Sequence, residues 1–292
     1  MIKFSLILVT FNRIKSLRKT LDSLSFSLEG FNNWELFIID NCSNDGTIDY
    51  CTAKFKDSGR VKIISNGIRS AYVSRNIGIK NSSGEYLMFL EDDLIIPRDW
   101  FSKIAALSME RPDERVFTYS IKSQGKFSNV LTAIQEQEKE NALKKRELTG
   151  CVSCPSFLIK KTVFDKLGLF SENNRGGDID FTLRLLKNNE KITLRKEVFV
   201  YHEFAHSLND FMKRSFAYGY SFSENNNKYG GAFAASQKIA DKIMKNMSTP
   251  FRWAKNMEGN YIFNLLLCYI HELSFISGGL AHKSRLKKNP VT

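Results

Sequence analysis

Short apolar runs alternate with amphipathic stretches along the first third of the chain. A run of about four to eight apolar residues is typical of a strand that is buried on both faces of a parallel sheet. Four leucines at helical spacing, from Leu17 to Leu28, follow the first run, and residues 70–81 also have a helical pattern. Strands are predicted at residues 3–10, 36–39, 61–64 and 85–90. The alternation predicts a parallel α/β sheet flanked by helices.

The rest of the 292-residue chain is long enough to extend this sheet and to add an appendage. A polar, charge-rich stretch over residues 122–148 is predicted to be a surface excursion, and the pattern from about residue 207 to the end is helical. Other predicted elements are helices after Pro97 to about residue 109, at 162–167 and after an acidic segment at 176–180, and strands at 156–159 and 198–201. We therefore predict a sheet domain followed by a helical region.

Polar residues follow three of the predicted strands. They are the segments 10–13, 40–45 and 91–93, each directly after an apolar run. In open α/β sheets, ligands bind beyond the carboxyl ends of the strands. Three separate loops are therefore expected to converge on one crevice.

The carboxylates of Glu91, Asp92 and Asp93 repel one another at the end of a buried strand unless a positive group offsets them. A divalent cation does so, and Mg²⁺ or Mn²⁺ both accept such oxygen ligands. The alternative interpretation is an acidic, capped turn before Pro97. The acidic motif does not stand alone, and further motifs elsewhere in the chain favour the metal site over the capped turn.

Five segments resemble the signatures of the family 2 inverting glycosyltransferases, in order and at familiar spacing. They are residues 5–13, 40–47, 75–93, 177–184 and 201–203, so that the resemblance covers about residues 3–225. It implies a GT-A fold, which is a Rossmann-like, mostly parallel sheet flanked by helices, here with a C-terminal helical extension. The catalytic domain would span residues 1–205, with the nucleotide-sugar side at about 1–95 and the acceptor side at about 96–205. The helical region would span residues 206–292.

The resemblance implies a set of donor-binding residues. Thr10, Phe11 and Arg13 would line the nucleoside pocket, Asp40 would hydrogen-bond the base, and Arg75 would lie close to the base or the phosphates. These roles suit the chemistry of the groups, since an aromatic ring stacks on a base and a guanidinium binds phosphate. Core packing is the alternative for Phe11. Asp45 and Gly46 are expected to cap and open the next helix rather than to touch a ligand.

The metal ligands are also carried over by resemblance. Asp93 would bind Mn²⁺ or Mg²⁺, and Asp92 would contact both the ribose and the metal. His202 would be a third metal ligand or a diphosphate contact, with a structural role as the alternative. Glu91 stands where the family often has Asp, and its longer side chain leaves its part in metal binding open.

Inverting transfer requires a general base that reaches the acceptor hydroxyl. The resemblance assigns this role to Asp178, with Asp180 as the alternative base or an acceptor contact. Gly177 stands where the family usually has Glu, which removes one carboxylate. A helix N-cap followed by a first-turn acid is the structural alternative for the same residues.

The charge of +12 favours phosphate-bearing partners, and it is concentrated in the tail, where residues 205–292 hold 12 Lys and Arg against 5 Asp and Glu. The apolar stretch 261–281 has His271 and Glu272 near its centre, which argues against a membrane span. We predict peripheral membrane contact through residues 250–288, with a packing helix or a homo-oligomer contact as alternatives.

The cysteine content favours a reducing compartment. Five cysteines are an odd number, and no apolar signal sequence precedes the first strand. Cys151 and Cys154 form one CxxC, but neither a second CxxC nor a paired His follows at zinc-ligand spacing. We expect a cytoplasmic protein, with the inner face of the membrane as a further location, and no structural zinc.

The sequence therefore predicts a metal-dependent inverting glycosyltransferase. It would move a sugar from a UDP-, GDP- or dTDP-sugar to a saccharide, lipid-linked or protein acceptor, in cell-surface polysaccharide or glycoconjugate biosynthesis. The alternative is a non-enzymatic basic protein that binds nucleotides or nucleic acid. A basic patch with interleaved aromatic residues would favour that alternative, and the basic residues are instead dispersed. No nucleic-acid partner is expected.

Overall fold

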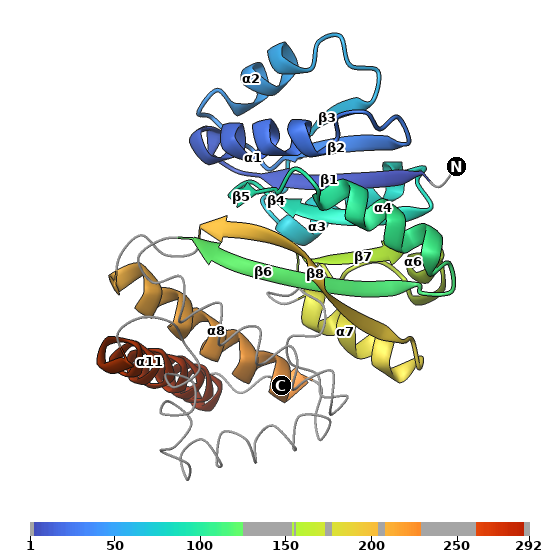
Figure 1. The fold of residues 1–292 in the computed structure, drawn as a ribbon. Helices are drawn as coiled ribbons and strands as arrows, with labels where there is room; N and C mark the ends of the chain where they lie inside the picture. The colour runs from blue at the N-terminus through green and yellow to red at the C-terminus, as the bar shows by residue number, and fades with distance from the viewer. Residues whose placement is uncertain are drawn as a thin grey trace. The chain divides into compact units, whose positions relative to one another are not determined.

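The computed structural model describes residues 3–124, 154, 156–172, 177–203, 208–228 and 261–288 (Figure 1). The strands are β1 (Phe4–Thr10), β2 (Trp34–Asp40), β3 (Val61–Ser65), β4 (Tyr86–Glu91), β5 (Leu94–Ile95), β6 (Val116–Gln124), β7 (Phe157–Lys160) and β8 (Ile192–Glu203). The helices are α1 (Ile14–Ser27), α2 (Thr47–Lys54), α3 (Ala71–Asn81), α4 (Trp100–Glu110), α6 (Lys161–Leu167), α7 (Gly177–Lys187), α8 (Leu208–Lys228) and α11 (Tyr261–Lys288).

The strands form one sheet in the order β3-β2-β1-β4-β7-β6-β8-β5. Strands β3, β2, β1 and β4 are parallel to one another, whereas β7 is antiparallel to both β4 and β6, and β5 is antiparallel to β8. In the parallel part, Thr10 is opposite Asp40, and Val9 is opposite Glu91. The carboxyl ends of β1, β2 and β4 therefore meet at one edge, as the apolar runs predicted.

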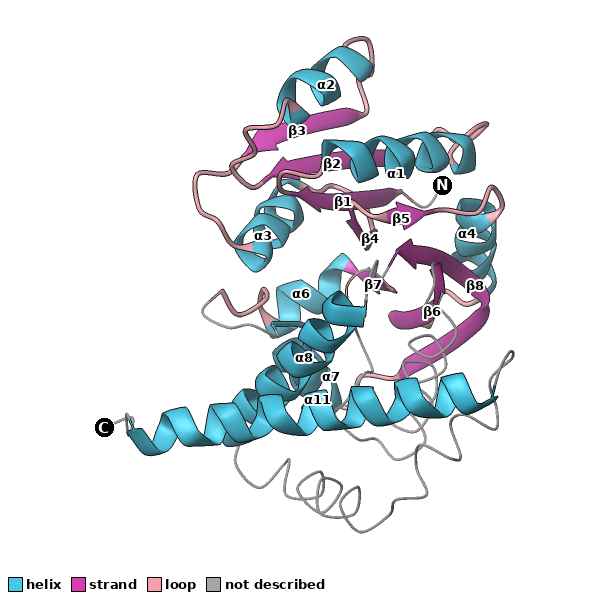
Figure 2. Ribbon diagram, turned by 90° about the vertical axis from the view of Figure 1, so that its left-hand side faces the viewer, coloured by secondary structure: helices cyan, strands magenta, loops and turns pink. Residues whose placement is uncertain are grey.

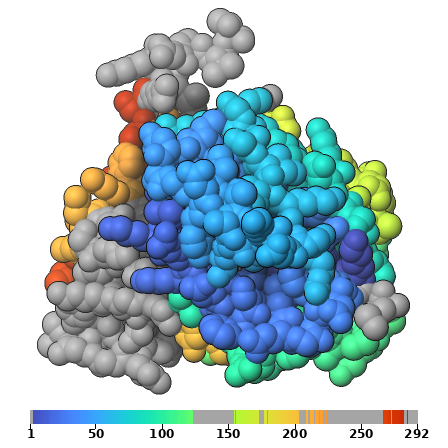
Figure 3. All heavy atoms as spheres, turned by 90° about the horizontal axis from the view of Figure 1, so that it is seen from above, coloured from blue at the N-terminus to red at the C-terminus, as the bar shows by residue number. Residues whose placement is uncertain are grey.

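Apolar side chains of the strands alternate between two cores, one on each face of the sheet. Leu6 and Leu8 of β1 pack with α1 and α4, which lie on the same side of the sheet (Figure 1). Ile7 points the other way and packs with α3, α6 and α7. The leucine stripe of α1 is buried, so its helical spacing identified the face that packs on the sheet. Seen from above, residues of the N-terminal part make up most of the visible surface of this unit (Figure 3).

Two glycines set how closely elements approach. A Cβ on Gly78 of α3 would lie 2.4 Å from Cγ2 of Ile7, so α3 can lie against β1 only because this position has no side chain. A Cβ on Gly84 would lie 2.5 Å from the Ser5 hydroxyl. Gly84 instead donates its N–H to that hydroxyl at 2.8 Å.

A buried carboxylate, Glu35 of β2, organises the edge of the sheet opposite the carboxyl ends of the parallel strands. It accepts hydrogen bonds from the Ser5 hydroxyl at 2.6 Å and from the Ser83 N–H at 2.6 Å, and it pairs with Lys3 at 3.2 Å. These bonds hold β1, β2 and the turn before β4 in register. They outweigh the effect of burial and lower the pKa of Glu35 from 4.5 to about 2.

Helices α8 and α11 belong to the second of two compact units into which the chain divides. They cross closely, since a Cβ on Gly219 would lie 1.8 Å from the Phe275 carbonyl oxygen and one on Gly278 would lie 2.0 Å from that of Phe216 (Figure 2). A buried contact of 2.8 Å joins the Ser215 hydroxyl to Nδ1 of His271. Neither these nor the other described helices are long and apolar enough to cross a membrane.

The predicted α/β class and the GT-A arrangement are confirmed. The sequence patterns missed β6 and the two-residue β5, and they gave only the last part of β8, which starts at Ile192. Most of the predicted excursion at 122–148 lies outside the described residues, although its first three residues belong to β6. The helical prediction beyond residue 207 is confirmed over α8 and α11.

Candidate functional site

The loops that follow β1 and β2 are hydrogen-bonded to each other. The Asn12 N–H donates to the Ser43 hydroxyl at 2.8 Å, and the Asn44 N–H donates to Oδ1 of Asn12 at the same distance. Asp45 accepts from the Ile14 N–H at 2.9 Å, and from the Thr47 N–H at 3.2 Å. Asp45 thus joins the first turns of α1 and α2, in agreement with the capping role expected for it.

Asp92 is the point where the β1 and β4 loops meet. The Thr10 hydroxyl donates to its Oδ2 at 2.8 Å, and the Phe11 N–H lies 3.4 Å from the same atom. Arg13 approaches Oδ1 at 3.5 Å. Burial outweighs these favourable contacts and raises the pKa of Asp92 to about 6. Three of the predicted donor-binding residues are therefore held around one buried carboxylate.

Asp93, Glu91 and His202 form a second group beside it. Their ligand atoms lie within 4.8 Å of one another, and among the described residues no other group of three or more such side chains could hold a metal ion. Nε2 of His202 lies 2.8 Å from Oδ1 of Asp93 and 3.3 Å from Oε2 of Glu91. Burial lowers the pKa of His202, but the two carboxylates outweigh it and raise the pKa to about 9.

The fold explains how His202 reaches the acids from so far along the chain. Strand β5 pairs with β8 so that Leu94 is opposite His202. Leu94 follows Asp93 directly, so this two-residue pairing sets the imidazole beside the acidic segment. The other oxygen of Asp93 is paired with Arg13.

Glu91, whose role the sequence left open, faces two ways. Its Oε2 lies towards His202, and its Oε1 is 3.2 Å from Nη2 of Arg75. Arg75 is buried on α3, and burial alone would lower its pKa. The nearby Glu91 carboxylate is among the groups that nevertheless hold that pKa above its usual range, so the guanidinium stays charged. The longer side chain of Glu91 thus connects the group with His202 to the buried guanidinium.

Asp40, which was predicted to hydrogen-bond the base of the nucleotide, is buried at the end of β2. Its Oδ2 accepts from the Ser43 N–H at 2.9 Å, and its Oδ1 is buried without a hydrogen-bond partner. Such an acceptor needs a polar partner. Phe11 is half-buried and lies outside both apolar cores, and the Arg69 guanidinium lies 3.9 Å from the centre of its ring.

The two candidate bases on α7 have different partners. The Tyr72 hydroxyl donates to Oδ1 of Asp178 at 2.9 Å. Asp180 is paired with Arg184 at 2.9 Å, and Arg184 also donates to the carbonyl oxygens of Leu167 and Leu169. Asp180 therefore takes part in anchoring the residues directly after α6.

Sequence patterns missed Arg69 and Tyr72. Both lie beside predicted site residues, but their contacts join segments far apart in the chain and could not be inferred from neighbouring residues. The spacing of Tyr72 and Arg75, three residues apart on α3, could have indicated a shared helix face.

The described cysteines form no metal group with acids or histidines. Cys42, Cys51, Cys154 and Cys268 form no disulfide, and Cys151 of the CxxC lies outside the described residues. Burial raises the pKa of the Cys154 thiol, and that of Cys51 to about 11. Both remain protonated thiols at neutral pH.

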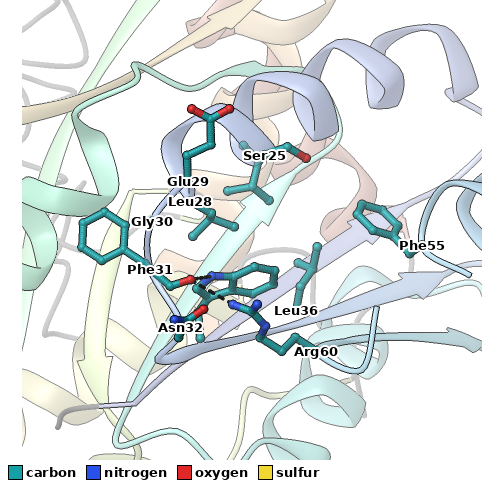
Figure 4. Close-up of a pocket in the computed structure, with 11 residues that line it drawn as sticks. Ser25, Leu28, Glu29, Gly30, Phe31, Asn32, Leu36, Phe55 and Arg60 are labelled. Atoms are coloured by element: carbon teal, nitrogen blue, oxygen red, sulfur yellow. Dashed lines mark hydrogen bonds between the residues drawn. The ribbon is translucent and has the colours of Figure 1, made fainter. Parts of the chain in front are cut away.

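A cavity of about 270 Å³ lies away from these groups (Figure 4). Its wall includes Phe31, Trp34, Phe55 and Arg60, from the end of α1 and from β2 with its neighbouring loops. The Trp34 indole and the Arg60 guanidinium both donate to the Phe31 carbonyl oxygen at 2.9 Å. None of the predicted site residues lines this cavity.

Comparison with known proteins gives three kinds of match. The model of the family described as "Glycosyl transferase family 2" matches residues 5–168. A curated relative, the poly(ribitol-phosphate) beta-N-acetylglucosaminyltransferase TarP of Staphylococcus aureus, is 27% identical over 72% of this chain and 64% of its own length. The chain thus spans less than two thirds of that relative.

Two solved structures share the fold. Residues 1–349 of S. aureus TarS, in complex with UDP-GlcNAc, give a TM-score of 0.57 at 17% identity, covering 98% of this chain and 92% of that one. The mannosyltransferase PcManGT from Pyrobaculum calidifontis, in complex with GDP-Man and Mn²⁺, gives 0.60 at 12% identity, covering 100% of this chain and 76% of that one.

Proposed function

The chain belongs to glycosyl transferase family 2, and from this premise we propose that it transfers a sugar from a nucleotide diphosphate donor, with inversion, to an acceptor in polysaccharide biosynthesis. The observation that carries the proposal is the convergence of Asp40, Asp92 and the group Glu91–Asp93–His202 at one edge of the sheet. The names of the relative and of the two structural neighbours, which mention a sugar transfer, UDP-GlcNAc and GDP-Man, support the donor class.

The nucleoside would bind between the first two loops. Asp40 has a buried oxygen that lacks a partner, and a base N–H would supply one. Phe11 and Arg69 present a ring and a guanidinium stacked on each other, and both groups stack on bases. Asp92, held by Thr10, would accept from a ribose hydroxyl.

The donor set of Glu91, Asp93 and His202 fits a divalent cation. Carboxylate oxygens suit both Mn²⁺ and Mg²⁺, whereas an imidazole nitrogen favours Mn²⁺, so we propose Mn²⁺. When bound, the cation would neutralise charge that develops on the departing diphosphate. Asp92, which the resemblance assigned to both ribose and metal, lies outside the group of three and is proposed as a ribose contact.

Asp178 is our proposed general base, since Asp180 is already paired with Arg184. The Asp178 carboxylate would take the proton from the acceptor hydroxyl while the acceptor oxygen bonds to the anomeric carbon. The bond from that carbon to the diphosphate oxygen breaks, and the nucleoside diphosphate leaves with the electron pair. Arg75, next to Glu91, would contribute positive charge close to the phosphates.

A panel of UDP-, GDP- and dTDP-sugars tests the proposal. Release of the nucleoside diphosphate should occur with at least one donor in Mn²⁺ and stop when the cation is chelated. No release from any donor, together with tight and salt-sensitive binding to oligonucleotides, would favour the nucleic-acid alternative.

We further propose that the helical unit contacts an anionic membrane. Helix α11 exposes Leu266, Leu273 and Leu280, seven residues apart, and the tail is rich in Lys and Arg. Leu273→Glu should reduce flotation with phosphatidylglycerol vesicles, and Met109→Glu, at an exposed residue of α4, should not. Unchanged flotation of Leu273→Glu, or concentration-dependent dimers without vesicle binding, would favour an oligomer contact instead.

A further inference from the structure

The ring of Tyr72 lies in a space that the absence of a side chain at Gly177 leaves open. A Cβ on Gly177 would lie 2.8 Å from Cδ1 and 2.9 Å from Cε1 of the tyrosine ring, and 3.0 Å from the Ser171 carbonyl oxygen. Contacts of that length with a ring and a backbone atom require one of the groups to move. Any larger residue at this first position of α7 would therefore displace the ring.

The surroundings leave the ring little freedom to move. Asn76, one turn further along α3, accepts from the Phe170 N–H at 3.1 Å and donates to the Phe170 carbonyl oxygen at 3.0 Å. This pair of bonds fixes Phe170 to α3. The Tyr72 ring also packs against Phe170, with centroids 5.8 Å apart, and against the Arg75 guanidinium at 5.1 Å.

The direction of the hydrogen bond between Tyr72 and Asp178 follows from the chemistry. Burial and the nearby carboxylate raise the pKa of Tyr72 well above its usual value, so the hydroxyl keeps its proton and donates. A donor 2.9 Å from Oδ1 favours the ionised carboxylate and restricts rotation of its side chain. Fixing one carboxylate oxygen also fixes the direction of the other.

We infer that Tyr72 is a positioning residue for the Asp178 carboxylate, and that Gly177 is required because it makes room for the Tyr72 ring. The inference rests on the proposed role of Asp178 as base. It also gives a physical reason for the missing carboxylate at position 177, where the chain departs from the family pattern: a side chain there would displace the tyrosine whose hydroxyl donates to Asp178.

Tyr72→Phe tests the inference, since it retains the ring and removes only the hydroxyl. We measure hydrolysis of UDP-N-acetylglucosamine with Mn²⁺, or of whichever panel donor turns over, with water in place of the acceptor. We expect kcat to fall about 10- to 100-fold with KM and UDP binding unchanged. Tyr86→Phe is the matched control, because it also removes only a tyrosine hydroxyl, from a buried residue that begins β4 at the opposite edge. An unchanged kcat in Tyr72→Phe overturns the inference.

Gly177→Ala provides a second test of the inference. It should lower kcat because the methyl group displaces the ring, and adding Tyr72→Phe to it should cause little further loss. If the losses in kcat of the two single variants multiply in the double variant, Gly177 acts through something other than Tyr72. That result would overturn this part of the inference.

A stability cycle makes the contact testable without activity. Urea unfolding of Tyr72→Phe, Asp178→Ala and the double variant should be non-additive if the hydroxyl and the carboxylate interact, and additive losses overturn the inference. If the cycle shows coupling but the unaltered protein and Asp178→Ala are equally inactive on every donor, the proposed function fails, and the positioning role fails with it.

Discussion

Replacing Glu35 with Gln should remove part of the pH dependence of the free energy of unfolding. Glu35 is buried, and its carboxylate receives two hydrogen bonds of 2.6 Å from Ser5 and Ser83 as well as the Lys3 ion pair. These partners hold its pKa at about 2 against an ordinary 4.5. That difference corresponds to about 3 kcal/mol in favour of the folded state.

The sign follows from the direction of the pKa change. Because the folded pKa is depressed, the stabilisation is complete above about pH 4.5, the unfolded pKa, and is lost as the pH falls towards 2. Glu35→Gln should therefore lower the free energy of unfolding by up to about 3 kcal/mol at pH 7. The gap between variant and unaltered protein should narrow below pH 4.5.

Urea denaturation at a series of pH values and constant ionic strength measures this gap. Glu29→Gln is the control, because Glu29 is exposed and its ion pair with Arg98 lies on the surface. Parallel stability curves for Glu35→Gln and the unaltered protein between pH 7 and pH 2 would refute the reasoning, since they would show that the carboxylate contributes no charge-dependent stability.

Three further predictions concern the site and its supporting glycine. Asp93→Ala should abolish Mn²⁺-dependent binding of UDP in calorimetry, whereas Asp178→Ala should retain it and stop turnover; normal turnover by Asp178→Ala would contradict the assignment of the base. Arg69→Ala should weaken UDP binding by about 1 kcal/mol, because it removes the guanidinium stacked on Phe11. An unchanged affinity for UDP would show that the uracil ring binds elsewhere. Gly78→Ala should destabilise the sheet unit by about 1–3 kcal/mol, because its Cβ would lie 2.4 Å from a β1 methyl group; an unchanged urea midpoint would show that α3 shifts freely.

The half of the site that depends on local sequence was predictable. Apolar runs that end in Thr10, Asp40 and Glu91 are read directly from the chain, and a parallel sheet brings such ends to one edge. The buried Glu35 was not predicted, because a single acid in a strand carries no sign of the serines that surround it. Strand β6 was missed although Phe117, Tyr119 and Ile121 alternate with polar residues and pack on the same core, a pattern that is typical of a strand.

Contacts between segments far apart in the chain could not be predicted from the sequence either. Tyr72 and Asp178 are 106 residues apart, and nothing near either one indicates the hydrogen bond. Gly177 was recognised in the sequence only as a departure from a pattern, and its physical reason needed the position of the Tyr72 ring. His202 was predicted by resemblance, but its approach to Glu91 and Asp93 depends on the two-residue pairing of β5 with β8.

Turnover of a nucleotide sugar in the presence and absence of Mn²⁺ tests the central claim most directly. The unaltered protein should release the nucleoside diphosphate from at least one sugar donor in Mn²⁺, should lose that activity in chelator, and should lose it equally with Asp93→Ala. Release that persists in chelator, or that Asp93→Ala retains, would contradict the assignment of Glu91, Asp93 and His202 as the metal site of a transferase.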